Sequence, residues 1–365
     1  MKFEESSNPG KKISFVLGSM GRGGAERVIS ILSNEFANEG WITQICLLLF
    51  NRVDYELDKS TKIFDFTGGM SSRLKRLPYW LRTIRHYVKK EKPDVIVSFA
   101  ARINVLVLLA TLGLRVKVIV SERNDPKHDG RGFITRLMVR LLYPFANRII
   151  FQTKRSLQYF SKNILKKGEV IPNPISVSCY ASNQKKKKIV TVGRLTKQKN
   201  QSLLIRAFAN IQKDFPDYEL YIYGDGEQKE NLIALSESLN IGNKVHFEGN
   251  ILNVHEKIAD AELFVLSSDY EGLSNALLEA LMMGIPCIST DCAGADEFIN
   301  NDENGLLVQV GNECDLYNTM KKVLSDDLLR IKLAKNAKIN STSFEKDYVL
   351  KQWMNVIGDI KCFGN

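Results

Sequence analysis

Short runs of β-branched and aliphatic residues alternate with longer helical patterns along almost the whole chain, and this alternation is interrupted once. Such spacing predicts βαβ units, in which helices connect the strands of a parallel sheet. Before the interruption we expect strands at residues 13–17, 43–50, 95–98, 116–120 and 148–152. After it we expect strands at residues 189–192, 220–223, 244–247, 263–266, 286–289 and 305–308.

The interruption marks a domain boundary. The alternation stops at Val170-Ile-Pro-Asn-Pro174 and restarts only after the polar stretch at residues 182–188. A chain of 365 residues also exceeds what one hydrophobic core usually serves. We therefore expect an α/β protein with two doubly wound parallel-sheet domains, residues 1–178 and 179–345, that face each other across a cleft. In such sheets ligands bind beyond the carboxyl ends of the strands, so function is expected in the loops that follow strands.

The net charge of +10 is unevenly distributed between these two parts. Residues 1–178 contain 30 Lys and Arg against 15 Asp and Glu, whereas residues 179–365 contain 21 against 26. A basic N-terminal part suits an anionic partner such as a nucleic acid, a phosphorylated acceptor or an anionic membrane surface.

Cysteine and histidine usage argues against metal or triad chemistry. The six cysteines include no Cys-x-x-Cys pair and the four histidines are scattered, so we expect no metal site and no Ser-His-Asp triad. The apolar run at residues 103–114 is too short to span a bilayer and predicts a buried helix. With no export signal at residues 1–9, we expect a cytoplasmic protein with reduced, mostly buried thiols.

A glycine-rich loop at residues 18–26 follows the first expected strand and opens a helix. Free backbone N–H groups at a helix start attract anions, so this loop resembles a phosphate cradle. An ordinary βα turn that requires glycine explains it equally well. A dinucleotide site fits less well, because Gly-x-Gly-x-x-Gly is absent and the second strand ends at Phe50-Asn51 without the ribose-binding acid.

The first loop of the C-terminal part, Val192-Gly-Arg-Leu-Thr-Lys-Gln-Lys-Asn200, places Arg194 and Lys199 just before a helix. Two cations at a helix start suit a diphosphate, most of all when the leaving group gains charge in the transition state. A solvated basic turn is the alternative.

The segment at residues 267–286 has a strand before it and Gly-Ile-Pro at the end of its helix. Glu271 lies in the loop, Glu279 lies about one turn inside the helix, and the N–H groups at the helix start belong to Gly272, Leu273, Ser274 and Asn275. Carboxylates suit sugar and ribose hydroxyls, whereas a helix start suits a phosphate. Glu279 could be a plain surface residue, but its neighbours are apolar, so its carboxylate needs a partner.

Five motifs in this order resemble glycosyltransferase family 4 over nearly the whole chain: Gly23-Gly-Ala-Glu-Arg27, Ile171-Pro-Asn-Pro174, Val192-Gly-Arg-Leu with Lys199-Asn200, Tyr223-Gly-Asp-Gly-Glu227, and Glu271-Gly-Leu-Ser with Glu279-Ala. The resemblance implies the GT-B fold, two Rossmann-like domains with the acceptor in the first and the donor in the second. It also implies a C-terminal helix, residues 346–360 with Tyr348, Trp353 and Val356, that packs back on the first domain.

By the same resemblance, sugar is transferred from a UDP-sugar with retention of anomeric configuration, without metal or cofactor, and without an enzyme nucleophile or general base. Arg194 and Lys199 would hold the donor diphosphate, Glu271 the transferred sugar, Glu279 the ribose, and residues 272–275 the distal phosphate. Gly23 and Gly24 would close over the diphosphate, and Gly249 and Asn250 would meet the base. Arg194, Lys199 and Glu271 are the residues expected to act in catalysis.

Two positions depart from this family pattern. Many relatives carry a histidine where this chain has Arg123, within Ser121-Glu-Arg-Asn-Asp-Pro126, so Arg123 and Asn124 are expected near the donor sugar or acceptor without an assigned role. Where relatives often have Gly-x-Arg-Glu, this chain has Gly294-Ala-Asp-Glu297, which weakens any inference of donor preference.

The chain also resembles bacterial members that elongate polyprenyl-diphosphate-linked or surface-polysaccharide glycans. This implies transfer of a hexose or N-acetylhexosamine, of the galactose or N-acetylgalactosamine type before the glucose type. Residues 73–92 combine eight Lys and Arg with Tyr79 and Trp80, and either rest on anionic lipid or form a solvated amphipathic helix.

Three other functions are open to this chain. A nucleic-acid-binding protein would explain only the basic N-terminal part, and no recognition motif supports it. A UDP-sugar epimerase of the same fold is the stronger alternative. A non-catalytic sugar-nucleotide sensor fits worst, because both acids and both cations are retained. The transferred sugar, the acceptor, the number of sugars added and the oligomeric state stay open.

Overall fold

A computed structural model describes residues 10–21, 23–68, 73–292, 294–340 and 342–358. Its contacts divide the chain into two compact units, one formed by Met1–Pro174 with Val349–Asn365 and the other by Ile175–Tyr348. The division falls four residues before the boundary expected at 178, and it lies inside the helix expected at residues 346–360. Residues 359 and 360 of that helix lie outside the described residues. We refer to the two parts as the first and second units.

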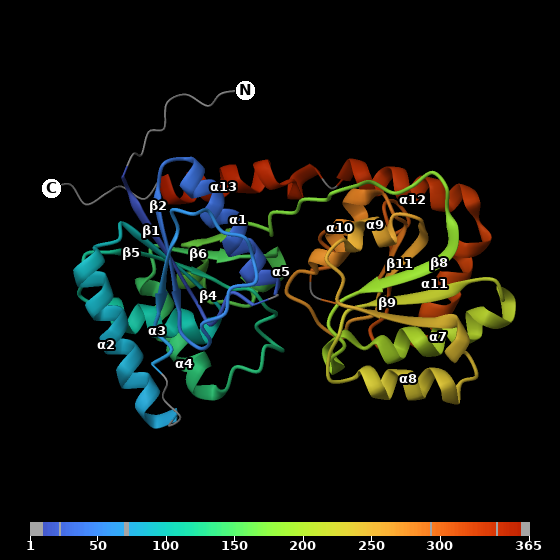
Figure 1. Ribbon diagram of the computed structural model, residues 1–365, viewed down its shortest axis with the longest axis horizontal. Helices are drawn as coiled ribbons and strands as arrows, with labels where there is room; N and C mark the ends of the chain where they lie inside the picture. Colours follow the sequence, from blue (N-terminus) through green and yellow to red (C-terminus); the bar gives the residue numbers. More distant parts are fainter. Residues whose placement is uncertain (1–9, 22, 69–72, 293, 341, 359–365) are drawn as a thin grey trace. The chain divides into compact units, whose positions relative to one another are not determined.

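The first unit contains a seven-stranded sheet with strand order β3-β2-β1-β4-β5-β6-β7, in which neighbouring strands are parallel. Its elements follow the chain as the alternation predicts (Figure 1). They are β1 Lys12–Leu17, α1 Gly24–Asn38, β2 Ile42–Leu47, β3 Lys62–Asp65, α2 Arg73–Glu91, β4 Val95–Phe99, α3 Ala101–Thr111, β5 Lys117–Ser121, α4 Phe133–Leu142, η1 Tyr143–Phe145, β6 Arg148–Phe151, α5 Lys154–Gln158, α6 Lys162–Leu165, β7 Gly168–Val170 and α13 Lys346–Gly358.

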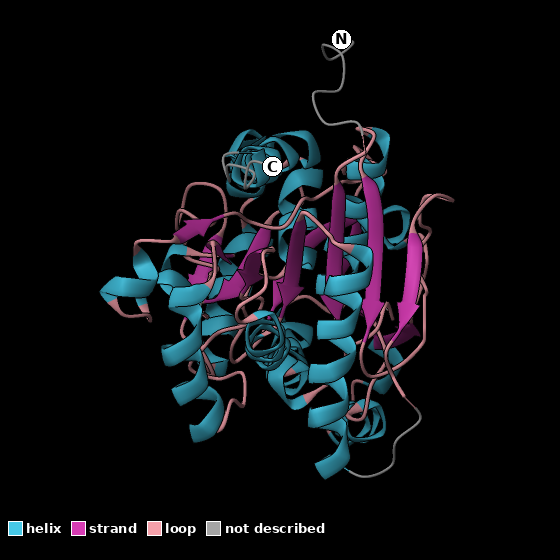
Figure 2. Ribbon diagram, turned by 90° about the vertical axis from the view of Figure 1, so that its left-hand side faces the viewer, coloured by secondary structure: helices cyan, strands magenta, loops and turns pink. Residues whose placement is uncertain are grey.

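Helices cover both faces of this sheet (Figure 2). Alternate strand residues such as Phe15 and Val97 pack with α1 and α13, while their neighbours Val16 and Ile96 pack with α2, α3 and α4. Because successive strand side chains point to opposite faces, strands covered on both sides become continuous apolar runs, as this sequence shows.

Helix α13 belongs to the core of the first unit. Trp353 is fully buried against Phe99, with the two rings stacked at 6.3 Å, and Val349, Val356 and Ile357 are buried in the same cluster. Tyr348, which was expected to share this role, is half exposed. A segment that follows the whole second unit in sequence thus completes the first.

The second unit contains a six-stranded parallel sheet with strand order β10-β9-β8-β11-β12-β13. Its elements are β8 Lys186–Val192, η2 Lys197–Lys199, α7 Gln201–Asp214, β9 Glu219–Tyr223, α8 Lys229–Ser238, η3 Gly242–Lys244, β10 Val245–Gly249, α9 Val254–Ile258, β11 Ala261–Leu266, α10 Asn275–Met283, β12 Cys287–Thr290, β13 Leu306–Val308, α11 Glu313–Ser325, α12 Asp327–Asn340 and η4 Thr342–Phe344.

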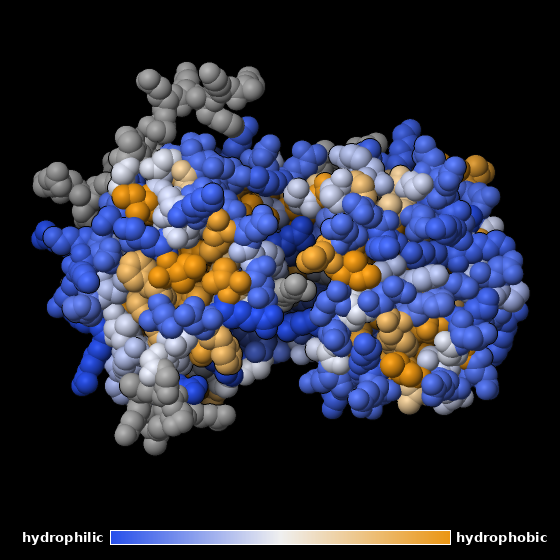
Figure 3. All heavy atoms as spheres, in the orientation of Figure 1, coloured by the Kyte–Doolittle hydropathy of each residue, from blue (hydrophilic) through white to orange (hydrophobic). Residues whose placement is uncertain are grey.

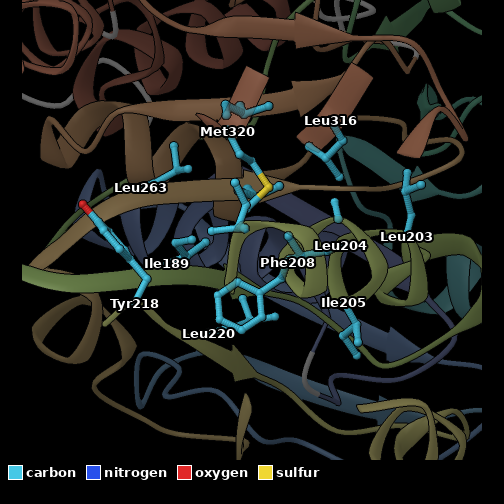
Figure 4. Packing of buried hydrophobic residues seen from close by; sticks show 14 of the residues in the cluster. Ile189, Leu203, Leu204, Ile205, Phe208, Tyr218, Leu220, Leu263, Leu316 and Met320 are labelled. Carbon is cyan, nitrogen blue, oxygen red and sulfur yellow. The ribbon is translucent and has the colours of Figure 1, made fainter. Parts of the chain in front are cut away.

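This second sheet is also covered on both faces. Helices α7, α8 and α11 contribute to the cluster around Phe208, Leu220 and Met320 (Figure 4), and α9, α10 and α12 contribute to the cluster on the other face. Both units are therefore doubly wound parallel α/β structures, which confirms the fold class predicted from the alternation.

Each sheet changes the direction of its strand order at one point. In the first unit the order reverses between β1 and β4, and in the second between β8 and β11. The loops that leave these paired strands diverge to opposite faces and leave room beyond their carboxyl ends, where ligands of such sheets bind. The loops after β1, β4, β8 and β11 are therefore the places to examine.

Three details differ from the sequence expectations. Strands β3 and β7 were not predicted, because each is only three or four residues long and neither is fully buried. Strand β2 ends at Leu47 rather than at residue 50. The polar stretch at 182–188 is not all linker, since Lys186–Lys188 begin β8, where Lys188 Nζ bonds the Lys257 carbonyl and Asp260.

Helix α2 directs its apolar side into the molecule. Ile84, Tyr87 and Val88 are buried in the core, and Trp80 packs against it while its Nε1 donates to the Phe66 carbonyl at 3.1 Å. The side chains of residues 73–75 lie outside the described part of the structure. From residue 76 onward the helix is a basic helix packed on a sheet, and Leu77 is its exposed large apolar residue.

Among the described residues, no helix is both long and apolar enough to cross a membrane.

Candidate active site

Two loops of the second unit meet at the carboxyl ends of β8 and β11. The β8 loop, residues 193–200, is joined to the β11 loop, residues 267–274, by four hydrogen bonds. These run from Asp269 N to the Gln198 carbonyl at 2.9 Å, from Gln198 Nε2 to the Tyr270 carbonyl at 2.9 Å, from Asn200 Nδ2 to Asp269 Oδ1 at 2.7 Å, and from Ser267 Oγ to the Lys199 carbonyl at 3.1 Å. The fold thus brings together residues about 70 positions apart.

Lys199 and Glu271 form an ion pair at the centre of this junction. Lys199 Nζ lies 2.5 Å from Glu271 Oε1, and the two side chains are only 15% and 8% exposed. Ser268 Oγ donates to the same Oε1 at 2.6 Å. A pair that is this shielded from water interacts more strongly than a surface pair and is held in one geometry.

Arg194 differs from Lys199 in being exposed. Its backbone is fixed, because its carbonyl accepts from Gln201 Nε2 at 3.0 Å and Leu195 N donates to the Asp225 carbonyl at 3.0 Å. Gly224 allows this turn to approach, since a Cβ there would lie 1.9 Å from the Gly193 carbonyl oxygen and its φ is +136°. The guanidinium is therefore presented to solvent from a rigid loop.

Helix α10 begins within the same junction. Ser274 caps it, with its hydroxyl accepting from Leu277 N at 3.4 Å, and Gly272, Leu273 and Asn275 flank that cap. The first N–H groups of a helix lack partners inside the helix and attract anions. A helix start beside a lysine and a carboxylate can bind a phosphate and a hydroxyl of one ligand.

Glu279 is buried on α10, and its partner is His255 on α9. His255 Nε2 lies 3.1 Å from Glu279 Oε2, and His255 Nδ1 lies 3.2 Å from Ser178 N. A backbone N–H can only donate, so Nδ1 is the acceptor and Nε2 carries the proton that is donated to Glu279. The Glu279 carboxylate is therefore oriented by the Nε2–H of a histidine whose ring is held by Ser178.

His255 was missed by the sequence analysis. It stands alone in a five-residue helix, 24 positions before Glu279. The need of Glu279 for a partner was predicted from its apolar neighbours, but no spacing rule connects the two residues, because the contact depends on how α9 and α10 pack on one face of the sheet.

Cys292 and Gly294 lie next to the ion pair. Together with Glu271 and Ser274 they line a small cavity of about 10 Å³. Burial, with a further contribution from the Glu271 carboxylate, raises the pKa of Cys292 to about 12. This thiol therefore stays protonated near neutral pH. The segment at 294–297, which departs from the family pattern, thus contacts the region of Glu271.

Gly249 ends β10, and Asn250 follows it at the same edge of the sheet. Gly249 has φ of +69°, and its carbonyl accepts from Gly224 N at 2.8 Å, which ties it to the β9 turn. Asn250 is exposed. These two residues thus belong to the same sheet edge as Arg194.

The glycine loop after β1 belongs to the first unit. Gly23 precedes α1, Gly24 begins it, and the Gly23 carbonyl accepts from Tyr55 Oη at 3.0 Å. A Cβ at Gly23 would lie 2.2 Å from Glu26 Oε2, so a larger residue here would displace this carboxylate. An acidic side chain thus already lies near the helix start where a phosphate cradle was considered.

Arg123, after β5, is held in an aromatic pocket. Its guanidinium lies 4.5 Å from the Phe99 ring centroid and 5.5 Å from that of Trp353, and Nη1 donates to Asn173 Oδ1 at 2.8 Å. Among the described residues, Nε and Nη2 are buried without a hydrogen-bond partner. Burial lowers the pKa of Arg123 to about 9. The Asn124 side chain accepts a hydrogen bond through Oδ1 from the backbone N–H of the next residue, Asp125.

A pocket of about 820 Å³ opens at the carboxyl ends of β1, β2 and β3. It is lined by apolar side chains including Leu49, Phe50 and Trp80, and by Arg52 and Arg76. Leu49 and Phe50 are exposed. Figure 3 shows apolar side chains gathered on the face of this unit that is turned to the viewer. The first unit thus offers a mixed apolar and basic pocket.

Within the described residues, no group of three or more His, Cys, Asp or Glu side chains could hold a metal ion. The predicted residues separate into two sets: Arg194, Lys199, Gly249, Asn250, Glu271, residues 272–275 and Glu279 share one sheet edge of the second unit, and Gly23, Gly24, Arg123 and Asn124 belong to the first.

Two family descriptions match the chain in succession. "Glycosyltransferase Family 4" matches residues 22–178, and "Glycosyl transferases group 1" matches residues 178–340. The chain is similar to two Campylobacter jejuni enzymes. One is N-acetylgalactosamine-N,N'-diacetylbacillosaminyl-diphospho-undecaprenol 4-alpha-N-acetylgalactosaminyltransferase, at 31% identity over 92% of this chain and 96% of that protein. The other is an alpha-1,4-N-acetyl-D-galactosaminyltransferase, at 28% identity over 96% and 99%.

Solved structures share the fold. Sucrose-phosphate synthase from Thermosynechococcus elongatus has a TM-score of 0.84 at 17% identity, covering 96% of this chain and 99% of that one. Anabaena HepE in complex with UDP and glucose has a TM-score of 0.82 at 20% identity, covering 96% and 100%. The matches support transfer of a hexosyl group rather than epimerisation or nucleic-acid binding. The chain belongs to the family 4 glycosyltransferases and is a hexosyltransferase of the GT-B fold.

Proposed function

We propose that this enzyme transfers a hexose or N-acetylhexosamine, of the galactose or N-acetylgalactosamine type, from a UDP-sugar to a hydroxyl of a growing glycan. The acceptor class is a polyprenyl-diphosphate-linked oligosaccharide or a surface-polysaccharide precursor. A glucose-type donor is the second choice. The observation that carries the proposal is the Lys199–Glu271 pair beside the start of α10, at the point where the second sheet reverses.

At this junction each part of the donor would have its own partner. Arg194 and Lys199 would bind the diphosphate, helped by the backbone N–H groups at residues 272–275. Among the described residues, Lys199 and Ser268 both bond Glu271 through Oε1, so Oε2 would be the oxygen offered to the transferred sugar. Glu279, oriented by His255, would bind the ribose, and the turn at Gly249 and Asn250 would meet the base. Because Lys199 has three N–H donors, it can bind a phosphate while it stays hydrogen-bonded to Glu271.

Transfer would proceed on one face of the sugar, with retention of configuration. The bond from C1 to the UDP oxygen breaks, the acceptor oxygen bonds to C1 from the same side, and the acceptor proton passes to the departing phosphate oxygen. Lys199 and Arg194 stabilise the negative charge that grows on UDP. The two cations supply the charge stabilisation that a metal would otherwise supply, so we propose a metal-independent reaction.

The acceptor would bind the first unit. The pocket at the carboxyl ends of β1, β2 and β3 combines apolar side chains with two arginines, which suits a ligand with a glycan or phosphate end and an apolar end. Both Campylobacter jejuni relatives are named for undecaprenol-linked acceptors. We further propose that the enzyme works at the cytoplasmic face of a membrane, where such acceptors lie. Arg123 and Asn124 are proposed to contact the donor sugar or the acceptor.

A donor screen followed by a transfer assay tests the proposal. A ligand that binds only the folded state raises the melting temperature, so UDP should raise it while GDP and ADP should not. UDP-N-acetylgalactosamine and UDP-galactose should then extend an undecaprenyl-diphosphate-linked oligosaccharide by one or more sugar masses in mass spectrometry. Equal shifts with all three nucleotides, or donor conversion without an acceptor, would contradict the proposal.

A further inference from the structure

Helix α4 exposes an unusually apolar surface. Phe133 is 80% exposed, Ile134 74% and Phe145, in the following turn η1, 64%, and Leu137 and Leu141 are exposed as well. Single exposed apolar residues are normal, but a contiguous group marks an interaction surface. We define these five residues as the α4 surface. The helix is drawn in green beside α3 in Figure 1.

The α4 surface is one face of a well-packed helix. Val139 and Leu142 are buried in the core of the first unit, and Met138 packs against it. At about 100° per residue, the exposed residues Phe133, Leu137, Leu141 and Ile134 fall within one arc of about 100°. The inward face of α4 packs in the core, so its outward apolar face has no packing role inside the unit.

A buried network fixes this helix in place. Arg131 Nη2 bonds Glu122 Oε2 at 2.6 Å, and Tyr143 bonds the same carboxylate from the far end of α4. Arg102 Nη2 on α3 donates to the Gly130 carbonyl at 3.2 Å. Both ends of the helix are therefore anchored, and the apolar face is held outward.

The charged residues within and after α4 in sequence are basic as far as Gly168, although Arg131 and Arg148 of this stretch pair with acids that flank it, Asp129 and Glu169. Arg136 and Arg140 are exposed on α4 and, by helical spacing, lie next to the apolar arc. From Gly130 to Gly168 the sequence contains no Asp or Glu. The same stretch contains nine cations, namely Arg131, Arg136, Arg140, Arg148, Lys154, Arg155, Lys162, Lys166 and Lys167.

Basic residues also reach the other end of the surface. Turn η1, which carries Phe145, lies against α6, and Lys167 Nζ donates to the Pro144 carbonyl at 2.6 Å. Lys162 and Lys166 are exposed there. The apolar row is therefore bordered by arginines along α4 and by lysines beyond η1.

We propose that the α4 surface docks on an anionic lipid membrane, with its apolar side chains in the headgroup region and the flanking cations on lipid phosphates. An apolar arc bordered by Arg and Lys without acids is the pattern of a helix that lies in the membrane interface. A second copy of the chain fits poorly, because a two-fold contact would oppose the same arginines. This inference deepens the membrane contact proposed above and assigns it to α4.

Helix α2, which the sequence analysis considered for contact with anionic lipid, differs from α4 in its exposed side chains. It carries more cations than α4, but Ile84, Tyr87 and Val88 point into the core and leave Leu77 as its exposed large apolar residue. Such a helix can add electrostatic attraction, which salt screens, but little apolar anchoring. The two helices therefore make different predictions in a binding experiment.

The test is flotation of the full chain with vesicles of phosphatidylglycerol and phosphatidylethanolamine, and with vesicles of phosphatidylcholine alone. Phe133→Ser with Ile134→Ser should lower binding to the anionic vesicles by about tenfold or more, because both side chains lose their apolar transfer energy. Leu328→Ser with Ile331→Ser, two exposed residues of α12, is the matched control and should bind within about twofold of wild type.

Charge variants separate the two helices. Arg136→Gln with Arg140→Gln should weaken binding to anionic vesicles and leave the weak binding to phosphatidylcholine unchanged. Unchanged binding by the Phe133→Ser, Ile134→Ser variant would overturn the assignment. So would loss of binding only in Arg82→Gln, Lys89→Gln, Lys90→Gln of α2. A wild-type dimer in light scattering that becomes a monomer in the α4 variant would make the surface a protein interface instead.

These measurements do not depend on transfer. Circular dichroism and melting temperature check that each variant is folded, and the α4 variant should transfer sugar to a water-soluble acceptor at the wild-type rate. Vesicle binding without transfer of any sugar would overturn the proposed function and leave this inference standing. If the wild-type protein transfers sugar but binds no vesicle, the proposed function stands and this inference is overturned.

Discussion

The two units have the same sheet design, yet their ligand edges are built in opposite ways. At the β8–β11 edge, Lys199 is paired with Glu271, and His255 is paired with Glu279. In the first unit, Arg123, which follows β5, has two buried donor atoms without a hydrogen-bond partner among the described residues, and Ala100, directly after β4, holds a φ of +76°. The second unit offers a site of paired polar side chains, whereas the first offers a mixed apolar and basic pocket and, separately, a buried guanidinium.

This difference shows that the fold determines where a ligand binds, whereas the side chains determine which chemistry the site has. The reversal of strand order tells where each unit binds a ligand, and it does so equally for both. The proposed roles of the two units would explain why the chemistry differs. A nucleotide donor in the second unit would present the same phosphates and ribose each time, which suits a preformed site. A growing glycan in the first unit would present a variable surface, which suits an open pocket.

The largest expected effect comes from a substitution at the β8–β11 edge of the second unit. Glu271→Ala should lower kcat by about 1,000-fold or more, because an interaction with the reacting sugar is lost at the step where charge develops. Steady-state transfer with the preferred UDP-sugar measures it, and Glu262→Ala, a partly exposed acid at the start of β11 and away from the carboxyl end of that strand, serves as the matched control. Activity within tenfold of wild type in Glu271→Ala would remove that residue from the reaction.

Removal of the cation tests whether the pair is preformed. Lys199→Ala leaves a buried carboxylate without its partner, so the free energy of unfolding should fall by about 3 kcal/mol in urea titration. The double variant Lys199→Met, Glu271→Met should recover most of this loss, since a buried pair can be replaced by apolar side chains at little cost. If the double variant loses as much free energy of unfolding as the two single variants together, the two residues contribute independently.

The next prediction concerns the histidine that orients Glu279. His255→Ala should raise the KM for the donor by about tenfold with kcat changed less than threefold, because a hydrogen bond to a charged group contributes about 1.5–3 kcal/mol and acts here on binding. His246→Ala is the control, since His246 also bonds a carboxylate, Glu219 at 3.0 Å, but is partly exposed on β10. Equal effects from both variants would argue against a positioning role.

The smallest expected effect lies in the first unit. Arg123→Met should change the free energy of unfolding by about 1 kcal/mol or less, because the lost stacking on Phe99 and Trp353 is offset by the relieved burial of a charge. Asn173 Oδ1 would keep its bond from Gln152 Nε2 at 2.8 Å. Unchanged stability with reduced transfer would identify Arg123 as a ligand contact. A loss of several kcal/mol would show that the guanidinium is structural.

Much of this architecture could be predicted from the sequence, because strand-like runs and helical patterns follow from burial on two faces. The five motifs also predicted which residues of the β8 and β11 loops lie at one edge. They could not predict that Lys199 and Glu271 bond each other directly, because that contact depends on side-chain geometry across 72 positions. They could not tell which side of α4 faces outward, because Phe133 and Leu142 are equally apolar in sequence.

Helix α13 gives the enzyme an order of assembly. The second unit is one continuous stretch, Ile175–Tyr348, whereas the first needs Val349 and later residues to cover its sheet. During synthesis the first sheet must therefore wait, with the surface that later receives Trp353 open, until the second unit has been made and α13 has left the ribosome. A fragment ending at residue 174 should accordingly aggregate, and adding a peptide of residues 346–358 should rescue it.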